Sequence, residues 1–365
     1  MNPIRPFTKN DVPQIMKLFQ KVFFNNGPTA PSSSKLDAYF EETFFHNPWA
    51  DGEIPSLVYE AGDGEIIGFI GIIPRRMRLH GRPIRAAISM HFMVEPGSRS
   101  TLAGVQLLKT FFSGPQDLSL TDSAGAVGRE IWEGVGGATA PAYSINWVRL
   151  LRPSRYVLRI LARKNRALRL LAAALRPLCP IVDAMAGRAA PRRFGKPATS
   201  LQETDLDKET LLAGIAQFSS GYALRPDYDP GSLSWLLAKA DQLAGPGALH
   251  KVALRNADGE LVGWLLYELN ADGLGEVLQI VGRKKSFGEV LDHLFYHGWR
   301  RGAIALSGRL DPKFAQELSD KCCFFNCGSP WTLTHSRNQE VLQAIYRGDL
   351  FLTRLEGEWC TRVPQ

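Results

Sequence analysis

The stretch that decides the fold is Asp63-Gly64-Glu65-Ile66-Ile67-Gly68-Phe69. It recurs as Asp258-Gly259-Glu260-Leu261-Val262-Gly263-Trp264, about 190 residues later. In each copy an Asp-Gly turn joins two short apolar segments that are rich in strand-forming residues. An Asp-Gly turn between such segments is a strong local signal for a β-hairpin. The sequence therefore predicts the same hairpin twice.

A second echo follows each hairpin, again in the same order. Residues 99–104 (RSTLAG) and residues 283–288 (RKKSFG) both place Arg and Gly five positions apart, ahead of apolar residues at helical spacing. Two echoes in the same order indicate an internal duplication. Asp63 and Arg99 are 36 residues apart, whereas Asp258 and Arg283 are 25 residues apart, so the duplication would be old or trimmed.

The length and composition favour a globular protein of two domains. The chain has 365 residues, of which 45% are hydrophobic and 22% are charged, and a single core rarely grows to that length. We expect domains at residues 1–150 and 197–365, joined by a helical segment at 151–196. The polar opening and the lack of a long apolar run predict a cytoplasmic protein without a secretory signal or a membrane-spanning helix.

The cysteines do not suggest a disulfide framework or a metal site. There are five, and three of them gather at Cys322, Cys323 and Cys327. An odd count with this uneven placement is typical of reduced thiols. Without paired CxxC spacing, we expect buried thiols rather than a zinc cluster, and no metal cofactor.

The predicted elements follow one order twice. In the first half we expect helices at 10–24 and 36–45, strands at 56–61, 66–74 and 85–94, a helix at 105–112, a strand at 118–122, a helix at 127–135 and a strand at 143–151. In the second half we expect helices at 206–218 and 232–240, strands at 251–255, 261–269 and 277–281, a helix at 288–298, a strand at 303–308, a helix at 312–321 and late strands at 331–335 and 350–355.

This order resembles that of the GNAT (Gcn5-related) N-acyltransferase superfamily, and the chain is similar to a tandem member of it. The acyl-CoA motif of the family is V-x-P, then R/Q-x-x-G-x-G/A. Val94, Pro96, Arg99 and Gly104 fit it, while Leu102 replaces the first glycine. The resemblance implies an α+β fold with two GNAT-like domains, each a mixed, mostly antiparallel sheet flanked by helices.

The motif of the second copy fits less well. Arg283 and Gly288 match the pattern, Ser286 stands in the place of the first glycine, and the proline is absent. We therefore expect the first domain to bind the donor and the second to be degenerate.

The turn itself has the chemistry of an anion site. Backbone N–H groups at the start of a helix carry partial positive charge, small residues allow close approach, and Arg adds charged hydrogen bonds. The resemblance implies that the anion is the pyrophosphate of acetyl-CoA or another acyl-CoA, held by Arg99, Ser100, Thr101, Leu102, Ala103 and Gly104. It also implies that the pantetheine arm lies along Phe92, Met93 and Val94. An ordinary strand–turn–helix with a solvated Arg is the alternative.

Three residues are candidates for the proton transfers of an acyltransferase. His91 lies on the strand before the turn and could accept the proton of an attacking amine; a hydrogen-bonded core histidine is the alternative. Asp122 is a second candidate base, with capping of the next helix as its alternative role. Trp132 replaces the tyrosine that many family members use as an acid, so Tyr143 or Ser123 would substitute, the thiolate would leave unaided, or activity would be lost.

The segment between the two copies is strongly basic. Residues 149–196 hold thirteen Lys or Arg and one acid, Asp183, for a net charge of +12, so the rest of the chain sums to −5. Arginines at 152, 155, 159, 163 and 166 share one helical face, leucines lie broadly opposite, and Pro177 and Pro180 are expected to end the helix. Through residues 152–176 such a helix would bind an anionic membrane surface, which would place the protein at the periphery of the inner membrane, or an acyl carrier protein. A linker helix with its leucines packed on a domain is the alternative, and nucleic acid is disfavoured because base-stacking aromatics are not interleaved.

The sequence thus predicts an acyl-CoA-dependent N-acyltransferase. It would transfer an acetyl or longer acyl group to an amine of a small molecule, amino acid, sugar or peptide by direct attack on the thioester. Two alternatives stay open: a catalytically dead acyl-CoA-binding protein, and a transferase that takes its donor from aminoacyl-tRNA or an acyl carrier protein.

Overall fold

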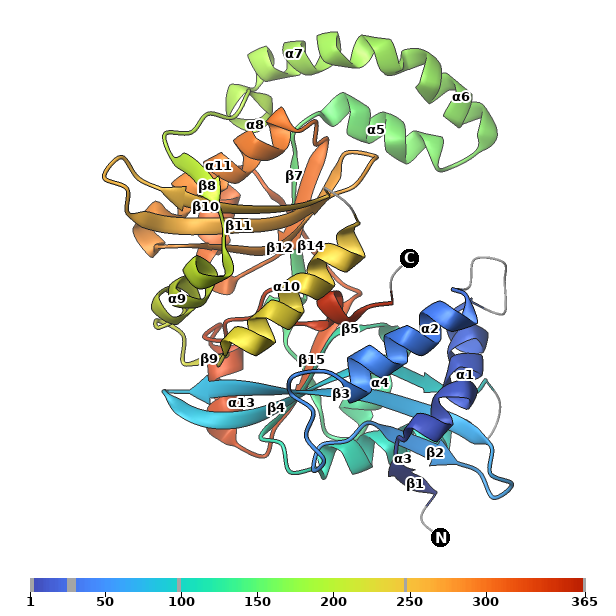
Figure 1. Cartoon of the computed structure of the whole chain (residues 1–365). Helices are drawn as coiled ribbons and strands as arrows, with labels where there is room; N and C mark the ends of the chain where they lie inside the picture. Colours follow the sequence, from blue (N-terminus) through green and yellow to red (C-terminus); the bar gives the residue numbers. More distant parts are fainter. Residues whose placement is uncertain (1–2, 25–30, 97–99, 246–247, 364–365) are drawn as a thin grey trace. The chain divides into compact units, whose positions relative to one another are not determined.

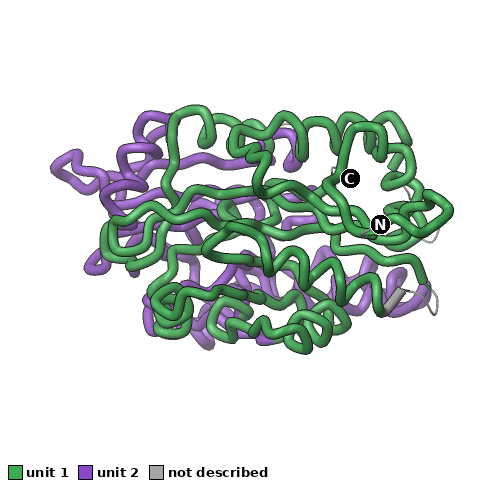
Figure 2. The backbone as a smooth tube through the Cα atoms, turned by 90° about the horizontal axis from the view of Figure 1, so that it is seen from below, with its two compact units in different colours: residues 1–144, 220–239, 328–365 green, residues 145–219, 240–327 purple. Residues whose placement is uncertain are grey.

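The computed structural model describes residues 3–24, 31–96, 100–245 and 248–363, and these form two compact units (Figure 1). Unit 1 comprises Met1–Ser144, Ser220–Lys239 and Gly328–Gln365, and unit 2 comprises Ile145–Ser219 and Ala240–Cys327 (Figure 2). The units interleave along the chain, whereas the sequence prediction divides it into contiguous domains at 1–150 and 197–365.

Unit 1 is built on a mixed sheet of eight strands. In spatial order these are β1 (Ile4–Pro6), β2 (Leu57–Glu60), β3 (Ile66–Leu79), β4 (Arg82–Val94), β5 (Leu118–Ala124), β15 (Trp331–His335) and β6 (Ala138–Thr139), with β9 (Leu224–Pro226) added beside β3. All neighbours are antiparallel except β4 and β5, which are parallel.

Along the chain, helices of unit 1 precede and follow the first hairpin, and further helices lie in its later segments. They are η1 (Lys9–Asp11), α1 (Val12–Phe24), α2 (Ser33–Phe40), the π-helical turn η2 (Glu41–Phe45), α3 (Ser100–Phe112), α4 (Ala126–Gly134), η3 (Pro141–Ser144), most of α10 (Pro230–Ala244), α13 (Gln339–Tyr346) and η7 (Glu358–Thr361). The periodicity of α1 explains its position, because Ile15, Leu18 and Phe19 are buried on one side.

Unit 2 has a seven-stranded sheet of the same design. Its order is β8 (Gln202–Asp205), β10 (Leu249–Arg255), β11 (Leu261–Leu269), β12 (Leu274–Gly282), β13 (Ala305–Arg309), β7 (Ile145–Leu150) and β14 (Phe324–Cys327). Only β12 and β13 are parallel. Its helices are α5 (Pro153–Ala162), α6 (Arg166–Leu175), η4 (Arg176–Leu178), α7 (Cys179–Ala189), α8 (Pro191–Phe194), α9 (Lys208–Phe218), η5 (Lys284–Ser286), α11 (Phe287–Arg300), η6 (Pro312–Phe314) and α12 (Ala315–Asp320). The predicted α+β class with two mixed, mostly antiparallel sheets is confirmed.

The two sequence echoes form the same turn. Gly64 has φ +84° and Gly259 has φ +79°, a left-handed conformation that glycine adopts without steric cost. In each hairpin the Gly N–H donates to the carbonyl three residues earlier, at Ala61 (2.9 Å) and Asn256 (3.0 Å). The repeated Asp-Gly pair therefore makes β2–β3 in unit 1 and β10–β11 in unit 2.

In each sheet, the strand in the sixth position directly follows a strand of the other unit along the chain. In unit 1 the position between β5 and β6 is taken by β15, which follows all of the unit 2 strands along the chain. In unit 2 the matching position between β13 and β14 is taken by β7, which follows β6 directly. This exchange of strands, together with the segment Ser220–Lys239 of unit 1, makes the units interleave along the chain.

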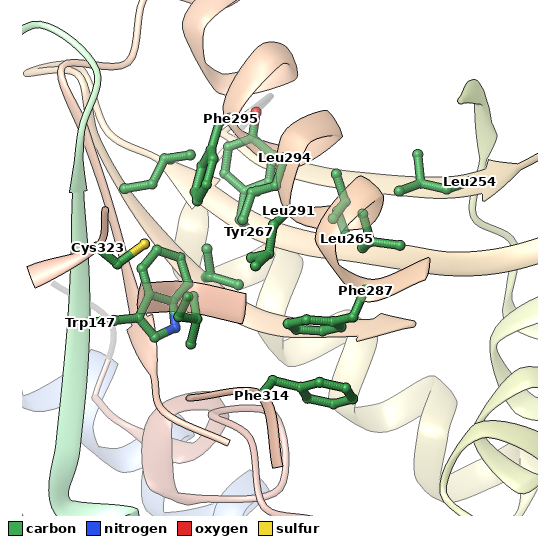
Figure 3. Close-up of a cluster of buried hydrophobic side chains, with 14 of the residues drawn as sticks. Trp147, Leu254, Leu265, Tyr267, Phe287, Leu291, Leu294, Phe295, Phe314 and Cys323 are labelled. Atoms are coloured by element: carbon green, nitrogen blue, oxygen red, sulfur yellow. The ribbon is translucent and has the colours of Figure 1, made fainter. Parts of the chain in front are cut away.

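Each exchanged strand carries part of its sheet's core. Trp147 of β7 is buried in the unit 2 core with Phe287, Leu291, Phe295 and Cys323 (Figure 3). In unit 1, Leu333 of β15 is fully buried in the cluster that contains apolar residues of β3 and α3. Neither core is complete without the exchanged strand.

The basic segment forms α5 to α8, and one part of it differs from the prediction. Pro177 and Pro180 do not end the helix, because each lies in the first turn of η4 or α7, where a missing N–H costs nothing. Arg166–Ala189 therefore runs as one helix of 24 residues with mean hydropathy 1.4 in its most apolar window, 11% of which is buried. By length and composition alone it is the one helix in the described residues that could cross a membrane, although the sequence led us to expect none.

Candidate functional site

The parallel strands β4 and β5 of unit 1 separate at the centre of the sheet. β4 pairs with β5 from Ala86–Leu118 to Ile88–Leu120 and then continues to Val94 without it. A bulge at the same place inserts an extra residue opposite Ile70, and His91 takes φ +49°. A bulge bends its strand and ends regular pairing. The last residues of β4 therefore present an edge that β5 does not cover.

Helix α3 begins where this free edge ends. A Cβ on Gly104 would lie 3.2 Å from the Phe92 ring and 3.3 Å from Val94, so glycine lets the helix sit close against β4. Ala103 is fully buried and Leu102 is exposed. Ser100 and Thr101 are in the first turn, and Arg99 lies outside the described residues. The free edge at Phe92, Met93 and Val94 and the start of α3 together fit an extended arm that ends in an anionic group.

A C-terminal turn, η7, joins the two parting strands. On the β5 side, the Glu358 carboxylate accepts hydrogen bonds from the Thr121 hydroxyl, the Asp122 N–H (3.1 Å) and the Ser123 hydroxyl (2.5 Å). On the β4 side, the Tyr39 hydroxyl donates to the Thr361 carbonyl and also bonds Nε2 of His91. The turn thus lies at the opening between β4 and β5.

Glu358 has the properties of a proton acceptor near neutral pH. Burial, followed by the negative charge of Asp122, raises its pKa to about 7. The donors from Thr121 and Ser123 oppose this shift without cancelling it. A base works best when its pKa lies close to the working pH. The sequence did not single out Glu358, because residues 350–355 were expected to form a strand and the acids beyond them had no motif.

Asp122 supports this turn. Its Oδ1 accepts the N–H of Glu358 at 2.8 Å, and a Cβ on Gly357 would lie only 1.8 Å from its Oδ2. The alternative role of helix cap is not realised, since α4 follows Gly125 as its N-cap. Asp122 therefore lies at the predicted place, and its contacts are with η7.

His91 lies beside the opening in an environment that keeps it neutral. The rings of Phe19, Phe23, Tyr39 and Phe40 surround it. Burial lowers the pKa of His91 to about 3. Because the Tyr39 proton is directed to Thr361, Nε2 of His91 is the donor to the Tyr39 oxygen, which leaves Nδ1 as the acceptor. Such a weakly basic imidazole is suited to holding Tyr39 in place.

Tyr143 is used by the fold. Its hydroxyl donates to the Leu350 carbonyl and accepts the Leu350 N–H, each at 2.8 Å. The ring is buried in the core cluster that contains Leu118 and Leu120. Trp132, which stands in place of the family's tyrosine, is also buried and donates from Nε1 to the Thr334 carbonyl at 3.1 Å. Ser123, the other proposed substitute, is bonded to Glu358.

Unit 2 repeats the geometry with different side chains. β12 pairs with β13 only from Leu274–Ala305 to Val277–Gly308, and it also contains a bulge. Gln279 stands three residues before the end of β12, as His91 does in β4, and it accepts a hydrogen bond from Trp264 Nε1 at 2.8 Å. Arg283 follows β12 and pairs with Glu260 at 3.2 Å. At the position where the first opening has a histidine, the second thus has a neutral glutamine.

A metal centre finds no support in the described part of the chain. It contains no group of three or more His, Cys, Asp or Glu side chains that could hold an ion. Of the clustered cysteines, Cys323 is buried in the unit 2 core, and burial raises the pKa of its thiol to about 12. That environment suits a packed thiol rather than a thiolate ligand.

Comparisons with known proteins identify the fold. No protein-family model matches the sequence, and no curated protein matches it significantly. Solved structures do match, and three of them cover 91–93% of this chain. A protein of unknown function from Enterococcus faecalis V583, called a probable N-acyltransferase, has TM-score 0.57 and 10% identity over 72% of its length. GCN5-related N-acetyltransferases from Kribbella flavida (0.54, 13%, 70%) and Anabaena variabilis ATCC 29413 (0.56, 11%, 74%) are similar. This chain has the GNAT fold.

Proposed function

We propose that the chain is an acyl-CoA-dependent N-acyltransferase whose reaction takes place in unit 1. The observation that carries the proposal is a coincidence in space: β4 leaves β5 where α3 begins, and a buried carboxylate with a pKa of about 7 crosses the same opening. The free edge of β4 would hold the arm of the donor, and the start of α3 its pyrophosphate. The names of the similar solved structures support an acyl-transfer reaction.

The chain's own groups supply the proton transfer. An amine attacks a thioester only when it is neutral, so a base must take its proton. Glu358 is the group we assign, because half of its population is ionised near pH 7 and Oε2 has a single donor, Ser123, among the described residues. The new C–N bond forms as the C–S bond breaks, the proton passes to Glu358, and the thiolate leaves with the electron pair.

His91, Tyr39 and Asp122 have positioning roles in this proposal. The hydrogen bond of Tyr39 to Thr361 fixes one end of η7, and that of Asp122 to the Glu358 N–H fixes the other. Because η7 is held at both ends, the Glu358 carboxylate is presented at a defined place in the opening. We expect enzymatic activity to depend on this turn more than on any single residue of β4.

The direct test is calorimetric titration of acetyl-CoA and a long-chain acyl-CoA into wild type, Arg99→Ala and Arg283→Ala. The two arginines occupy matching places in the two sequence echoes, so each is the control for the other. We expect Arg99→Ala alone to weaken binding, by about tenfold or more for a lost charged hydrogen bond. Equal loss in both variants would place a donor in each unit, and no binding in wild type would refute the acyl-CoA donor.

Turnover is measured separately, as release of free CoA thiol with a panel of amines. Tight acyl-CoA binding without release in the presence of any amine would favour a binding protein without activity. If no acyl-CoA binds, acyl carrier protein and aminoacyl-tRNA become the donors to test.

A further inference from the structure

A buried arginine in unit 1 makes no side-chain hydrogen bond within the described part of the chain. Arg75 of β3 is 7% exposed, and its Nε and both terminal nitrogens are buried without a hydrogen bond among the described residues. The face of its guanidinium stacks on the ring of Trp49 at 3.8 Å. Its neighbour Arg76, in contrast, is exposed and pairs with Asp229 at 3.5 Å.

Leaving such a cation unpaired is expensive. Removing a charge from water destabilises the fold unless hydrogen bonds or a counter-charge replace the lost hydration. Stacking on Trp49 replaces only part of it. Burial lowers the pKa of Arg75 to about 10, so the side chain is still a cation at neutral pH. The arrangement therefore calls for an anion that accepts these hydrogen bonds, which none of the described residues does.

The carboxylates that act on Arg75 through space are already engaged elsewhere. Glu356 lies close enough to influence the charge of Arg75. Its Oε1 accepts the Tyr228 hydroxyl at 2.8 Å, and its Oε2 accepts the N–H and the hydroxyl of Thr353. Asp122, which also acts on Arg75 through space, is bonded to the N–H of Glu358.

Two indole N–H groups of unit 1 are also buried without an acceptor among the described residues. Trp235 of α10 meets Trp49 edge-on at 5.6 Å, and its buried Nε1–H has no acceptor in the described chain. The same is true of Nε1–H of Trp359, one residue beyond Glu358. A guanidinium and indole N–H groups only donate hydrogen bonds. A ligand that satisfies them must accept, and a planar carboxylate matches the fork of an arginine.

We propose that Arg75, with the indole N–H of Trp235, binds a carboxylate of the acceptor, so that the substrate is an amine that also carries a carboxylate. This inference rests on the proposed acyl transfer in unit 1 and names its acceptor class. The guanidinium is within electrostatic reach of Asp122 and of Cys360, which lies two residues beyond Glu358. An amino acid or a conjugate that keeps its carboxylate would then have its amine directed toward Glu358.

The test compares acceptors that differ only in charge, with wild type, Arg75→Met and Arg76→Met. The pairs are leucine with leucinamide, and phosphoethanolamine with ethanolamine. In wild type we expect the carboxylate compound to be the better acceptor by kcat/KM, and Arg75→Met to lower that kcat/KM about 100-fold while leaving the amide unchanged. Arg76→Met should leave both unchanged. Equal use of leucine and leucinamide by wild type overturns the proposal, and a preference for phosphoethanolamine alone replaces the carboxylate with a phosphate.

A binding measurement separates this inference from the proposed function. Leucine and leucinamide are titrated by calorimetry into wild type and Arg75→Met without any donor. Binding of leucine that Arg75→Met abolishes supports the anion site even if acyl-CoA fails to bind. Acyl-CoA binding without any binding of leucine, or with binding that survives Arg75→Met, overturns the anion site and leaves the acyl-transfer proposal standing. We expect Arg75→Met to fold, because it removes an uncompensated buried charge.

A second, independent observation concerns the helical arm Arg166–Ala189 of unit 2. Seven large apolar side chains of this arm are 38–66% exposed: Leu170, Leu171, Leu175, Leu178, Ile181, Val182 and Met185. Their steps of one, three and four residues place them on one face of the helix. Ala172 and Cys179 are buried on the other face, where Asp183 accepts the Ser154 N–H at 2.8 Å. Figure 1 shows α5 lying beside this arm.

The surroundings of this apolar face are basic. Arg163, Lys164, Arg166, Arg169, Arg176 and Arg188 are all exposed, and Asp183 is the only acid between residues 149 and 196. On the helical wheel Arg166 and Arg188 flank the apolar face near the two ends of the helix, while Arg169 and Arg176 lie on the opposite side. An apolar helix face with cations near its two ends is complementary to a bilayer with anionic headgroups, since the leucines enter the acyl boundary and the cations stay at the phosphates. We infer that the arm docks unit 2 on an anionic membrane surface.

Vesicle sedimentation tests the docking. We expect the full chain to sediment with phosphatidylcholine vesicles that contain phosphatidylglycerol, at least about tenfold more strongly than with pure phosphatidylcholine, and high salt to weaken it. The variant Leu170→Asp/Ile181→Asp/Met185→Asp should lose binding, whereas Val127→Asp/Tyr346→Asp, which changes exposed apolar residues of unit 1, should keep it. Alkaline carbonate should release the protein. Equal binding by all variants, a dimer in ultracentrifugation that the triple variant splits, or resistance to carbonate would each overturn surface docking.

Discussion

In unit 1 the opening beyond Ile88 is crossed by η7, with two acidic side chains, a histidine and a tyrosine at the place where β4 leaves β5. In unit 2 the parallel strands also separate and β12 also contains a bulge, which falls between its pairings with Leu266 and Tyr267, but Gln279 stands three residues before the end of β12, as His91 does in β4. Its partner there is Trp264, at the position of Phe69 in the repeated hairpin. The two sheets thus share a strand arrangement, while the histidine of the first has a neutral glutamine as its counterpart in the second.

This difference teaches that the site depends on a segment outside the repeat. The turn Glu358–Thr361 follows the last strand and has no counterpart in the second echo of the sequence. It reaches unit 1 because β15 returns the chain to that sheet. The experiments below either break or sharpen this contrast, from the largest expected effect to the smallest.

The largest effect is expected for Glu358→Gln. If Glu358 accepts the proton of the amine, the rate of acyl transfer should fall by about 10²–10⁴-fold while acyl-CoA binding is unchanged. In wild type kcat/KM should rise with pH through about 7, because only the ionised carboxylate accepts a proton. The variant should lose this rise. A steady-state pH profile checks both points, and a profile that keeps its rise in the variant would assign the base to another group.

The next effect is structural and compares the two openings directly. A Cβ at Gly357 would lie 1.8 Å from Asp122, and a Cβ at Gly308 would lie 2.7 Å from the buried ring of Trp147. We expect Gly357→Ala and Gly308→Ala each to destabilise the fold by about 1–3 kcal/mol. Hydrogen exchange should localise the loss, to η7 and β5 for the first and to β7 and β13 for the second.

The control for this pair is Gly128→Ala, since a Cβ at Gly128 of α4 meets nothing within 4 Å. It should be neutral or slightly stabilising, because alanine is the better helix former. If Gly357→Ala behaves like this control, η7 is not held tightly against β5, and the contrast between the units loses its basis.

A smaller effect is expected for Tyr143→Phe. The change removes both hydrogen bonds to Leu350 and should cost about 1–2 kcal/mol of stability. The rate of acyl transfer should stay within about twofold of wild type, because the hydroxyl serves the fold. Chemical denaturation and CoA release measure the two quantities, and a rate loss of two orders of magnitude would restore Tyr143 as the acid.

The smallest effect on rate is expected for His91→Gln, which places the residue of unit 2 in unit 1. With a pKa of about 3, His91 is neutral at pH 7, so the rate should stay within about tenfold of wild type. The substitution should also change stability at acid pH. In the unfolded chain the imidazole of His91 has a pKa near 6.5 and binds a proton, whereas in the folded chain burial lowers its pKa to about 3. This stability is present above pH 6.5 and is lost as the pH falls toward 3. The variant should therefore unfold at a lower pH in an acid titration, and a 100-fold rate loss would make His91 the base after all.

Much of this fold follows from local patterns. The two Asp-Gly hairpins, the strand before each Arg turn and the helix after it are all where the sequence predicts them, because period and turn chemistry are local properties. Several features were missed, among them the short strands β1, β8, β9 and β14. Residues 350–355 do not form a strand, apart from an isolated bridge at Leu350, and helix α13 was not foreseen.

Neither the strand exchange nor the grouping of Glu358, Arg75 and Trp235 in unit 1 could be predicted from the sequence. The signals of β7 and β15 are those of ordinary strands, and which sheet each joins is decided by long-range packing. Glu358, Arg75 and Trp235 lie far apart along the chain and belong to no shared motif. Sequence reasoning proposed His91, on the strand before the recognisable turn, and Asp122, on the strand that follows, and it had no means of proposing groups that only the fold brings to this place.

The exchanged strands also have a consequence for how the protein is made. β6 leaves the ribosome about 190 residues before β15, its neighbour in the finished sheet. At roughly 5–20 residues per second, unit 1 must wait about 10–40 s with β5 lacking its antiparallel partner. An exposed strand edge of that kind invites pairing with other nascent chains. The yield of native protein should therefore depend on the speed of synthesis, and neither half expressed alone should assemble a complete sheet.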